Sequence, residues 1–287
     1  MSAVTASTAQ AKVIYAERWR HRLYPIVMYL VMATAVLLVT FPLIYAFVLA
    51  TQETSTGTLH LGGALIENAT TAWERVHMGR LMVNTLIVAL TVALGKILLS
   101  LLGAFGLIYF RVRGGMIILA LVMLTHLLPL PVRIVPTYDL LTELGRVDTF
   151  KGLTIPFFAS ATGLLLFQQF FRTVPTDLAD AARVDGAGPF RFFVSILVPV
   201  SRTNIGALFL IEFVYMWNQY LWPLIVANSD RTRQVQVGIK QLVATDSVIE
   251  WGVLTSGALM IIIPPLIVLL ALQNSLMSGL TASSEDF

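Results

Sequence analysis

Apolar residues run in six long stretches, separated by short segments that hold glycine, proline or clustered charge. A helix that crosses a bilayer core about 30 Å thick needs roughly 20 such residues. Backbone groups inside hydrocarbon must be satisfied within the segment, so each stretch is predicted to be a helix. The third stretch is the shortest, because Pro129 and Pro131 stop it. The predicted spans are approximately 24–50, 81–110, 115–130, 152–171, 204–227 and 255–276.

Charged residues are scarce along the whole chain. Of its 287 residues, 12% are Asp, Glu, Lys or Arg, whereas an average soluble protein has about 25%. This composition excludes an ordinary soluble enzyme. There is no cysteine, and the four histidines show no metal-ligand spacing, so neither disulfides nor a metal site is expected. The net charge is +3 without a long basic run, which argues against nucleic-acid binding.

We therefore predict an all-α integral membrane protein with six transmembrane helices. Four cations precede the first span, and cations of this kind favour the cytoplasmic side. The N-terminal segment 1–23 and, after an even number of spans, the tail 281–287 are both expected to be cytoplasmic. Between them lies a membrane domain, 24–280. This orientation puts ten Lys and Arg residues on the cytoplasmic side and eight outside.

The predicted cytoplasmic loop 172–203, between the fourth and fifth spans, has an unusual pattern. Pro175 and Thr176 offer a helix start, and Gly186 and Gly188 interrupt the chain before a second, aromatic segment at 190–197. The expected result is a compact helix–Gly–helix element that is half apolar. Exposed apolar surface of this kind indicates either a docking site or an interfacial helix lying on lipid headgroups.

The same loop resembles the EAA motif in permease subunits of bacterial ABC importers. In that motif Glu-Ala-Ala, three intervening residues, Gly and nine more residues precede Ile-x-Leu-Pro. This chain keeps the spacing, with Asp in place of the motif's Glu and Val198 in place of its Leu. The resemblance implies a coupling helix that sits in a cleft of a cytoplasmic ATPase, with the nearby phenylalanines 190, 192 and 193 tying it to the membrane bundle. The coupling residues would be Asp180, Ala181, Ala182, Asp185, Gly186, Ala187 and Pro199.

The likeness extends along nearly the whole chain, which is similar to carbohydrate-uptake permeases of the maltose-permease type. The runs 128–137 and 212–225 are closer to the second permease subunit of sn-glycerol-3-phosphate importers. The resemblance implies alternating-access import of glycerol-3-phosphate or glycerophosphodiesters; a disaccharide or oligosaccharide is the alternative. It also implies the bacterial inner membrane and three kinds of protein partner: a second, different permease, two ATPase subunits and an extracytoplasmic solute-binding protein.

No phosphate-binding loop of the form Gly-x-x-x-x-Gly-Lys-[Ser/Thr] occurs in the sequence. The chain is therefore not expected to be an enzyme or to bind a cofactor, and ATP and Mg²⁺ would be bound by the partner ATPase. An intramembrane enzyme would need clustered catalytic groups, yet His126 stands alone in the third span, where a core role is expected. A self-sufficient secondary transporter would need inverted repeats or broken spans instead of a docking loop.

Two ionisable residues, Lys96 and Glu212, lie inside predicted spans. Such groups are costly in a membrane and often functional. They either pair across the bundle or find separate contacts.

Glu212 is also the first of four polar or aromatic residues that recur on one face of the predicted fifth span, followed by Tyr215, Gln219 and Trp222. This face is expected to line either the translocation path or a helix–helix interface. Arg133, between two prolines at the outer mouth, either binds a phosphate or caps a helix end. With Lys96 and Arg133, the candidates for the path are Glu212, Tyr215, Asn218, Gln219 and Trp222.

The predicted outer loop 228–251 carries many charges and little apolar mass. Such a loop is usually solvated, and the resemblance implies that it contacts the binding protein. The candidate contacts are Asp230, Arg231, Arg233 and Lys240, and the loop 51–80 is a second docking candidate.

Overall fold

The computed structural model describes residues 2–53, 61–243 and 249–281, and this part of the chain is all helices and turns, without a strand. The fold is therefore all-α, as predicted. The segments 54–60, 244–248 and most of the predicted tail lie outside the described residues. The helices are α1 (Ser2–Ala50), α2 (Leu65–Arg75), α3 (Met78–Tyr109), α4 (Gly115–His126), α5 (Leu130–Glu143), α6 (Phe150–Thr154), α7 (Ala161–Thr173), α8 (Thr176–Val184), α9 (Pro189–Phe192), α10 (Val198–Val200), α11 (Arg202–Trp217), α12 (Leu221–Val226), α13 (Val235–Gly238) and α14 (Trp251–Thr281).

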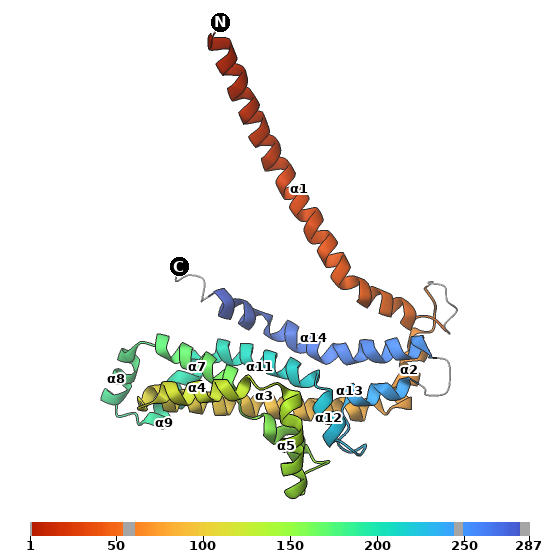
Figure 1. The fold of residues 1–287 in the computed structure, drawn as a ribbon, viewed down its shortest axis with the longest axis vertical. Helices are drawn as coiled ribbons and strands as arrows, with labels where there is room; N and C mark the ends of the chain where they lie inside the picture. Colours follow the sequence, from red (N-terminus) through yellow and green to blue (C-terminus); the bar gives the residue numbers. More distant parts are fainter. Residues whose placement is uncertain (1, 54–60, 244–248, 282–287) are drawn as a thin grey trace.

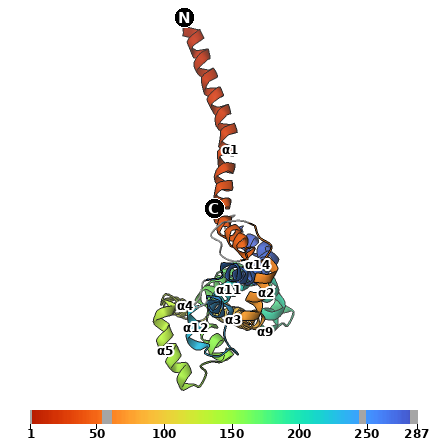
Figure 2. The same cartoon turned by 90° about the vertical axis from the view of Figure 1, so that its right-hand side faces the viewer.

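The helices α3, α7, α11 and α14 pack side by side as a bundle (Figure 1). The short helices α8 and α9 lie at one end of this bundle, and α2, α12 and α13 lie at the other. Helix α1 meets the bundle only near its C-terminal end and then rises away from it (Figures 1 and 2). Its apolar side chains between Tyr24 and Phe47 are mostly exposed in the isolated chain, which suits a helix that lies in lipid or against another subunit.

Three helices are long and apolar enough to cross a bilayer without a break: Tyr24–Ala50 of α1, the whole of α3, and Trp251–Gln273 of α14. They match the first, second and sixth predicted spans. The other three predicted spans are not long unbroken helices. The third corresponds to the short α4, which a turn of 95° separates from α5; the fourth is bent by 44° before α7; and the fifth begins in α11, after a turn of 72° from the preceding helical segment. Six spans result only if each bent pair is counted as one, and the third pair then includes α9 and α10 of the loop before α11.

The breaks have identifiable local causes. Pro129, in extended conformation, precedes α5, because proline cannot continue the preceding helix but suits the start of a new one. Ser160 opens α7, its hydroxyl accepting a hydrogen bond from the Gly163 amide at 3.0 Å. The predicted fifth span is not one helix, since α11 ends at Trp217 and α12 begins at Leu221.

Two apolar clusters hold the bundle together. The larger lies toward the α12 end and includes the fully buried Trp217, whose Nε1 donates to the carbonyl of Ile261 in α14 at 3.1 Å. The smaller lies at the α8 end and includes Phe105, Phe167 and Phe193. Close approach of α7 to its neighbours requires Gly163, because a Cβ there would lie 2.5 Å from Ser100 Oγ.

Candidate functional site

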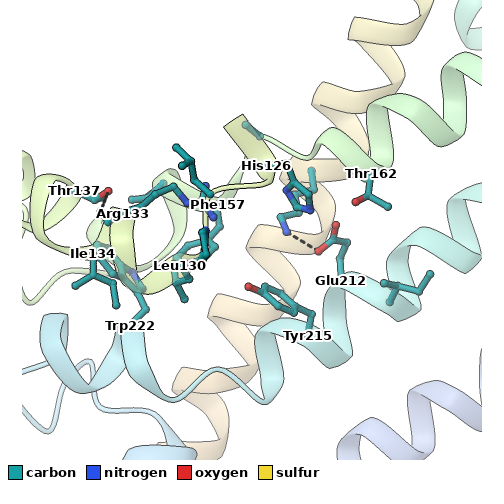
Figure 3. A pocket seen from close by; sticks show the side chains of 16 residues that line it. His126, Leu130, Arg133, Ile134, Thr137, Phe157, Thr162, Glu212, Tyr215 and Trp222 are labelled. Atoms are coloured by element: carbon teal, nitrogen blue, oxygen red, sulfur yellow. Dashed lines mark hydrogen bonds and ion pairs between the residues drawn. The ribbon is translucent and has the colours of Figure 1, made fainter. Parts of the chain in front are cut away.

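A cavity of about 350 Å³ lies where the break between α4 and α5 meets α3 and α11 (Figure 3). Its volume is in the range of small-molecule sites. Apolar walls come from Leu130, Ile134, Phe157 and other residues. The lining residues whose side chains carry a polar atom are Lys96, His126, Arg133, Thr137, Thr162, Glu212, Tyr215 and Trp222.

Five of the seven residues predicted for the translocation path line this one cavity: Lys96, Arg133, Glu212, Tyr215 and Trp222. They come from four helices, so tertiary packing brings them together.

The remaining two candidates lie elsewhere. Asn218 lines a separate hollow beside Ile261 and Pro265 of α14, and Gln219 lies in the break between α11 and α12. The prediction that these residues share one face of a single helix is therefore wrong, because α11 ends between Tyr215 and Trp222.

Lys96 and Glu212 form an ion pair, with 2.5 Å between Lys96 Nζ and Glu212 Oε2. Both side chains are more than nine-tenths buried, and Figure 3 shows the pair at the edge of the cavity. The second carboxylate oxygen accepts a hydrogen bond from Ser160 Oγ at 3.0 Å. The Lys96 ammonium also lies 5.1 Å from the centre of the Tyr215 ring. Of the two alternatives for these charges, the structure has the pairing, which joins α3, α7 and α11.

Arg133 lies in the first turn of α5 and faces the same cavity (Figure 3). Its Nε atom is buried without a hydrogen-bond partner, and its guanidinium has no carboxylate partner among the described residues. A cationic side chain caps the C-terminal end of a helix, not the N-terminal end where Arg133 lies. The structure thus favours an unpaired cation available to an anionic ligand over a helix cap.

His126 was predicted to have a core role, and this prediction is wrong. The residue ends α4 and its side chain is exposed and lines the same cavity as Glu212. The reason is that α4 stops before Pro129, so a residue expected inside a span lies at a helix end. The proline three positions later was the signal that could have indicated this placement.

The loop between α7 and α11 has the predicted helix–Gly–helix form. Helix α8 begins at Thr176 after the extended Pro175, with Asp177 in its first turn, where a carboxylate suits the helix dipole. The chain then reverses at Gly186, whose φ of +73° favours glycine. The second segment is α9, a π-helical turn over Phe193–Leu197, and α10.

The predicted coupling residues are divided between the two faces of this loop. Ala182 is buried and Ala187 is half-buried against the α3 end of the bundle, whereas Asp180, Ala181, Asp185, Gly186 and Pro199 are exposed. Asp180 is paired with Arg183, at 2.8 Å between Oδ1 and Nη1. The pKa of the Arg183 guanidinium is raised, chiefly by the Tyr109 hydroxyl and less by Asp180.

Two of the three phenylalanines in the loop tie it to α3. The Phe193 ring lies 4.9 Å from that of Phe105, and the Phe192 ring 5.5 Å from that of Tyr109. Phe190 does not share this role, because its side chain is 73% exposed. The expectation that all three anchor the loop is therefore wrong for Phe190, which points away from the bundle and leaves an apolar group on the outer face of the element.

Comparison with known proteins identifies the family to which this architecture belongs. A family model described as "Binding-protein-dependent transport system inner membrane component" matches residues 3–281. The chain belongs to this family. It is thus a multi-pass membrane permease subunit of an ABC importer, as the sequence predicted, and the alternatives of an intramembrane enzyme and of a self-sufficient secondary transporter fall away.

The permease also has curated relatives that match over nearly their whole length. It is 40% identical over 274 residues to the sn-glycerol-3-phosphate transport system permease protein UgpE of Agrobacterium fabrum, covering 91% of this chain and 97% of that protein. Identity to UgpE of Brucella melitensis is 40% over 271 residues, 90% of this chain and 96% of that protein. Identity to UgpE of Salmonella choleraesuis is 39% over 268 residues, with coverages of 89% and 95%.

Among solved structures, the permease is similar to a chain in the crystal structure of a bacterial ABC transporter involved in the import of the acidic polysaccharide alginate. The TM-score is 0.77 and the sequence identity 21%, with 88% of this chain and 96% of that chain covered. At this identity the likeness supports the fold alone.

The outer loop of the permease is more closely packed than its charged sequence indicates. Asp230 is paired with Arg233, Arg231 is exposed, and Lys240 lies with its ammonium 4.5 Å from the centre of the Tyr220 ring. Val235 is fully buried, and its amide donates to Thr85 Oγ1 in α3 at 2.9 Å. The prediction of a solvated loop is therefore wrong for α13 and the turn that follows it, although the charged residues remain at the surface.

A second loop of the permease fixes the start of this outer segment. The Asp148 carboxylate accepts hydrogen bonds from the amides of Asn228 at 2.9 Å and Ser229 at 3.1 Å, and from the Thr232 hydroxyl. Burial acts to raise the pKa of Asp148, but these hydrogen bonds together lower it below its usual value. No local pattern predicts this contact, because it joins residues about eighty positions apart.

Proposed function

We propose that this permease carries sn-glycerol-3-phosphate or a glycerophosphodiester across the inner membrane by alternating access. Relatives at about 40% identity are named for transport of sn-glycerol-3-phosphate. The observation in the structure that carries the proposal is the unpaired guanidinium of Arg133 in the wall of the central cavity. A guanidinium binds a phosphate through two parallel hydrogen bonds, so it suits this substrate class more than a neutral sugar.

The rest of the cavity supplies groups for a small polyol. Thr162 and Tyr215 bring hydroxyl groups, and Trp222 brings an indole whose buried Nε1 has no hydrogen-bond partner. Lys96 is neutralised by Glu212, so the pair adds no net charge and Arg133 dominates the local field. The helix breaks beside the cavity also support a solute-binding role, since irregular backbone inside a membrane is tolerated where it lines a polar cavity.

The proposed orientation places the α8 end of the bundle, with both chain termini, in the cytoplasm. This orientation puts ten Lys and Arg residues, four of them just before the first span, on the cytoplasmic side and eight outside, which is the direction that the positive-inside rule expects. There α8 and α9 would dock on an ATPase subunit through the exposed face that holds Ala181, Val184 and Phe190. The side chain of Val184 is 88% exposed. An apolar side chain this exposed indicates a surface that a docked partner would cover.

The proposed assembly contains a second, different permease subunit, two ATPase subunits that bind ATP and Mg²⁺, and an extracytoplasmic binding protein. The opposite end of the bundle would receive the binding protein. Asp230, Arg231, Arg233 and Lys240 remain at that surface, on a segment anchored to α3 by the Val235 amide. Because this segment is anchored to α3, movement caused by docking of the binding protein would be passed to the helix bundle.

Replacing Arg133 by lysine is expected to reduce uptake of glycerol-3-phosphate about 10-fold or more, and replacing it by glutamine is expected to reduce it further. Lysine keeps the positive charge but loses the planar fork that pairs with a phosphate, and tenfold corresponds to about 1.4 kcal/mol of binding. Uptake of labelled glycerol-3-phosphate by cells that contain the complete importer measures the effect.

Arg146→Lys is the matched control, because Arg146 is exposed and does not line the cavity. It should transport at the wild-type rate. Equal uptake by the Arg133→Lys and Arg133→Gln variants and the wild type, at equal amounts of importer in the membrane, would remove Arg133 from the substrate path.

A further inference from the structure

A second cavity, of about 210 Å³, lies at the α8 end of the bundle, away from the translocation cavity. It is enclosed by the last turns of α3 and α7 and by α8. Aromatic and aliphatic side chains form its walls, and three arginines from three different segments stand around it. The apolar wall includes Phe105, Ile108, Phe171, Phe192 and Leu197.

The three arginines, Arg111, Arg172 and Arg183, carry more positive charge than their neighbours neutralise. Asp180 lies beside the cavity and pairs with Arg183. Arg172 faces the neutral side-chain oxygen of Gln168, at 2.6 Å from Nη2 in the amide orientation that satisfies both groups. Arg111 has no ion-pair partner within the described ranges. The cavity therefore offers about two uncompensated positive charges beside an apolar wall.

The backbone at Arg111 holds its side chain at the cavity. Its φ of 47° lies in the left-handed region, which is uncommon for a residue other than glycine. This conformation ends α3 and turns the chain so that Arg111 lines the cavity while Arg113, two residues later, does not. Two neighbouring arginines of one loop thus have different surroundings, which supplies a matched comparison.

We propose that this cavity binds an anionic phospholipid, with its phosphate on the arginines and an acyl chain along the aromatic wall. Basic pockets between membrane helices on the cytoplasmic side suit such headgroups, and guanidinium forks match phosphate oxygens. A free phosphate would use the cations but leave the apolar wall unfilled. A neutral lipid would fill the wall but leave the charges unpaired. An anionic lipid satisfies both halves.

The position of the cavity gives a bound lipid a role in coupling. The loop 172–203 is the proposed coupling loop. Phe192, which ties this coupling loop to α3, and Ala179 of α8 both line the cavity. A lipid lodged there would fill the gap between α8 and the ends of α3 and α7, so that movement of α8 is passed to the bundle. This inference concerns the motor end of the permease and does not depend on which solute is carried.

The test measures phosphatidylglycerol bound to the purified, fully assembled importer in nanodiscs of phosphatidylcholine. The variant Arg111→Gln/Arg172→Gln removes two cavity cations. The control Arg113→Gln/Arg191→Gln removes two exposed cations from the same end of the molecule that do not line the cavity. Each arginine near an anionic lipid contributes about 1 kcal/mol of binding, and about 1.4 kcal/mol corresponds to a tenfold change in affinity. Loss of two arginines should therefore weaken the binding of phosphatidylglycerol on the order of 30-fold. The control should bind like the wild type.

An equal loss in both double variants would show only general surface attraction and would overturn the proposal, as would unchanged binding in the cavity variant. Inorganic phosphate that displaces the lipid at millimolar concentration would assign the site to a small anion instead.

A photoreactive phosphatidylglycerol on the wild-type complex gives a result even if the cavity variant does not assemble. Adducts mapped by mass spectrometry to the 105–111 and 171–183 segments support the site. Adducts confined to other helices contradict it.

Discussion

Replacement of Lys96 by methionine is expected to destabilise the permease by about 3–5 kcal/mol and to abolish uptake. The change leaves the Glu212 carboxylate buried without its cation, and removal of one partner from a buried ion pair costs about this much. The 2.5 Å contact joins α3 to α11, and Ser160 adds α7 through the same carboxylate, so three helices lose their common polar contact. The midpoint of thermal unfolding of the purified importer and uptake in cells measure the two effects.

Two further variants distinguish the interaction between Lys96 and Glu212 from the contribution of each residue alone. Exchange of the charges, Lys96→Glu with Glu212→Lys, should restore part of the stability that either single change removes. Rescue is incomplete because the new carboxylate would lie near the face of the Tyr215 ring, which attracts cations and repels anions. Lys151→Met, at an exposed lysine of α6, is the control and should unfold like the wild type. Strictly additive effects of the two exchanged charges would show that the residues act separately.

Replacement of Phe192 by alanine is expected to uncouple the importer. Phe192 is buried against Tyr109 at the point where the coupling loop contacts α3, and loss of a buried phenylalanine costs about 3–5 kcal/mol. The unfolding midpoint should fall, and the ATPase activity should lose its response to the loaded binding protein. Because the exposed docking face of α8 and α9 is unchanged, the ATPase subunits should still copurify.

Phe190→Ala is the matched variant, since Phe190 lies two residues away but is 73% exposed. Here the unfolding midpoint should stay at the wild-type value while less ATPase subunit copurifies. A fall in the midpoint of similar size in both variants, with equal ATPase retention, would contradict the division of the coupling loop into a face toward the bundle and a face toward the motor.

The apolar runs of the sequence were sufficient to predict an all-α membrane fold and the positions of the long apolar spans within α1, α3 and α14, but not that α1 begins at Ser2. They did not predict the breaks. A run such as 204–227 has the length and composition of one span, and the polar residues within it, Asn218 and Gln219, were assigned to a polar face of one helix although they lie where the helix is interrupted between Trp217 and Leu221. Hydropathy measures the cost of contact with water, whereas a break depends on which neighbours satisfy the freed backbone groups.

The sequence predicted which residues belong to the candidate site better than it predicted how they are arranged in space. The rarity of ionisable residues inside spans singled out Lys96 and Glu212, but their pairing joins positions 116 residues apart and depends on tertiary packing. His126 was misplaced because one proline decided where α4 ends. The helix–Gly–helix form of the loop 172–203 was predicted correctly, since its helix start and its glycine turn are local signals.

Stimulation of ATP hydrolysis in the reconstituted importer tests the central claim most directly. The complete complex is placed in lipid vesicles with its binding protein, and the ATPase rate is measured with glycerol-3-phosphate, a glycerophosphodiester or a disaccharide. The proposed function predicts stimulation by at least one of the two phosphate esters, reduced in the Arg133→Gln variant, and none by the disaccharide. Stimulation by the disaccharide together with no response to either phosphate ester would contradict it.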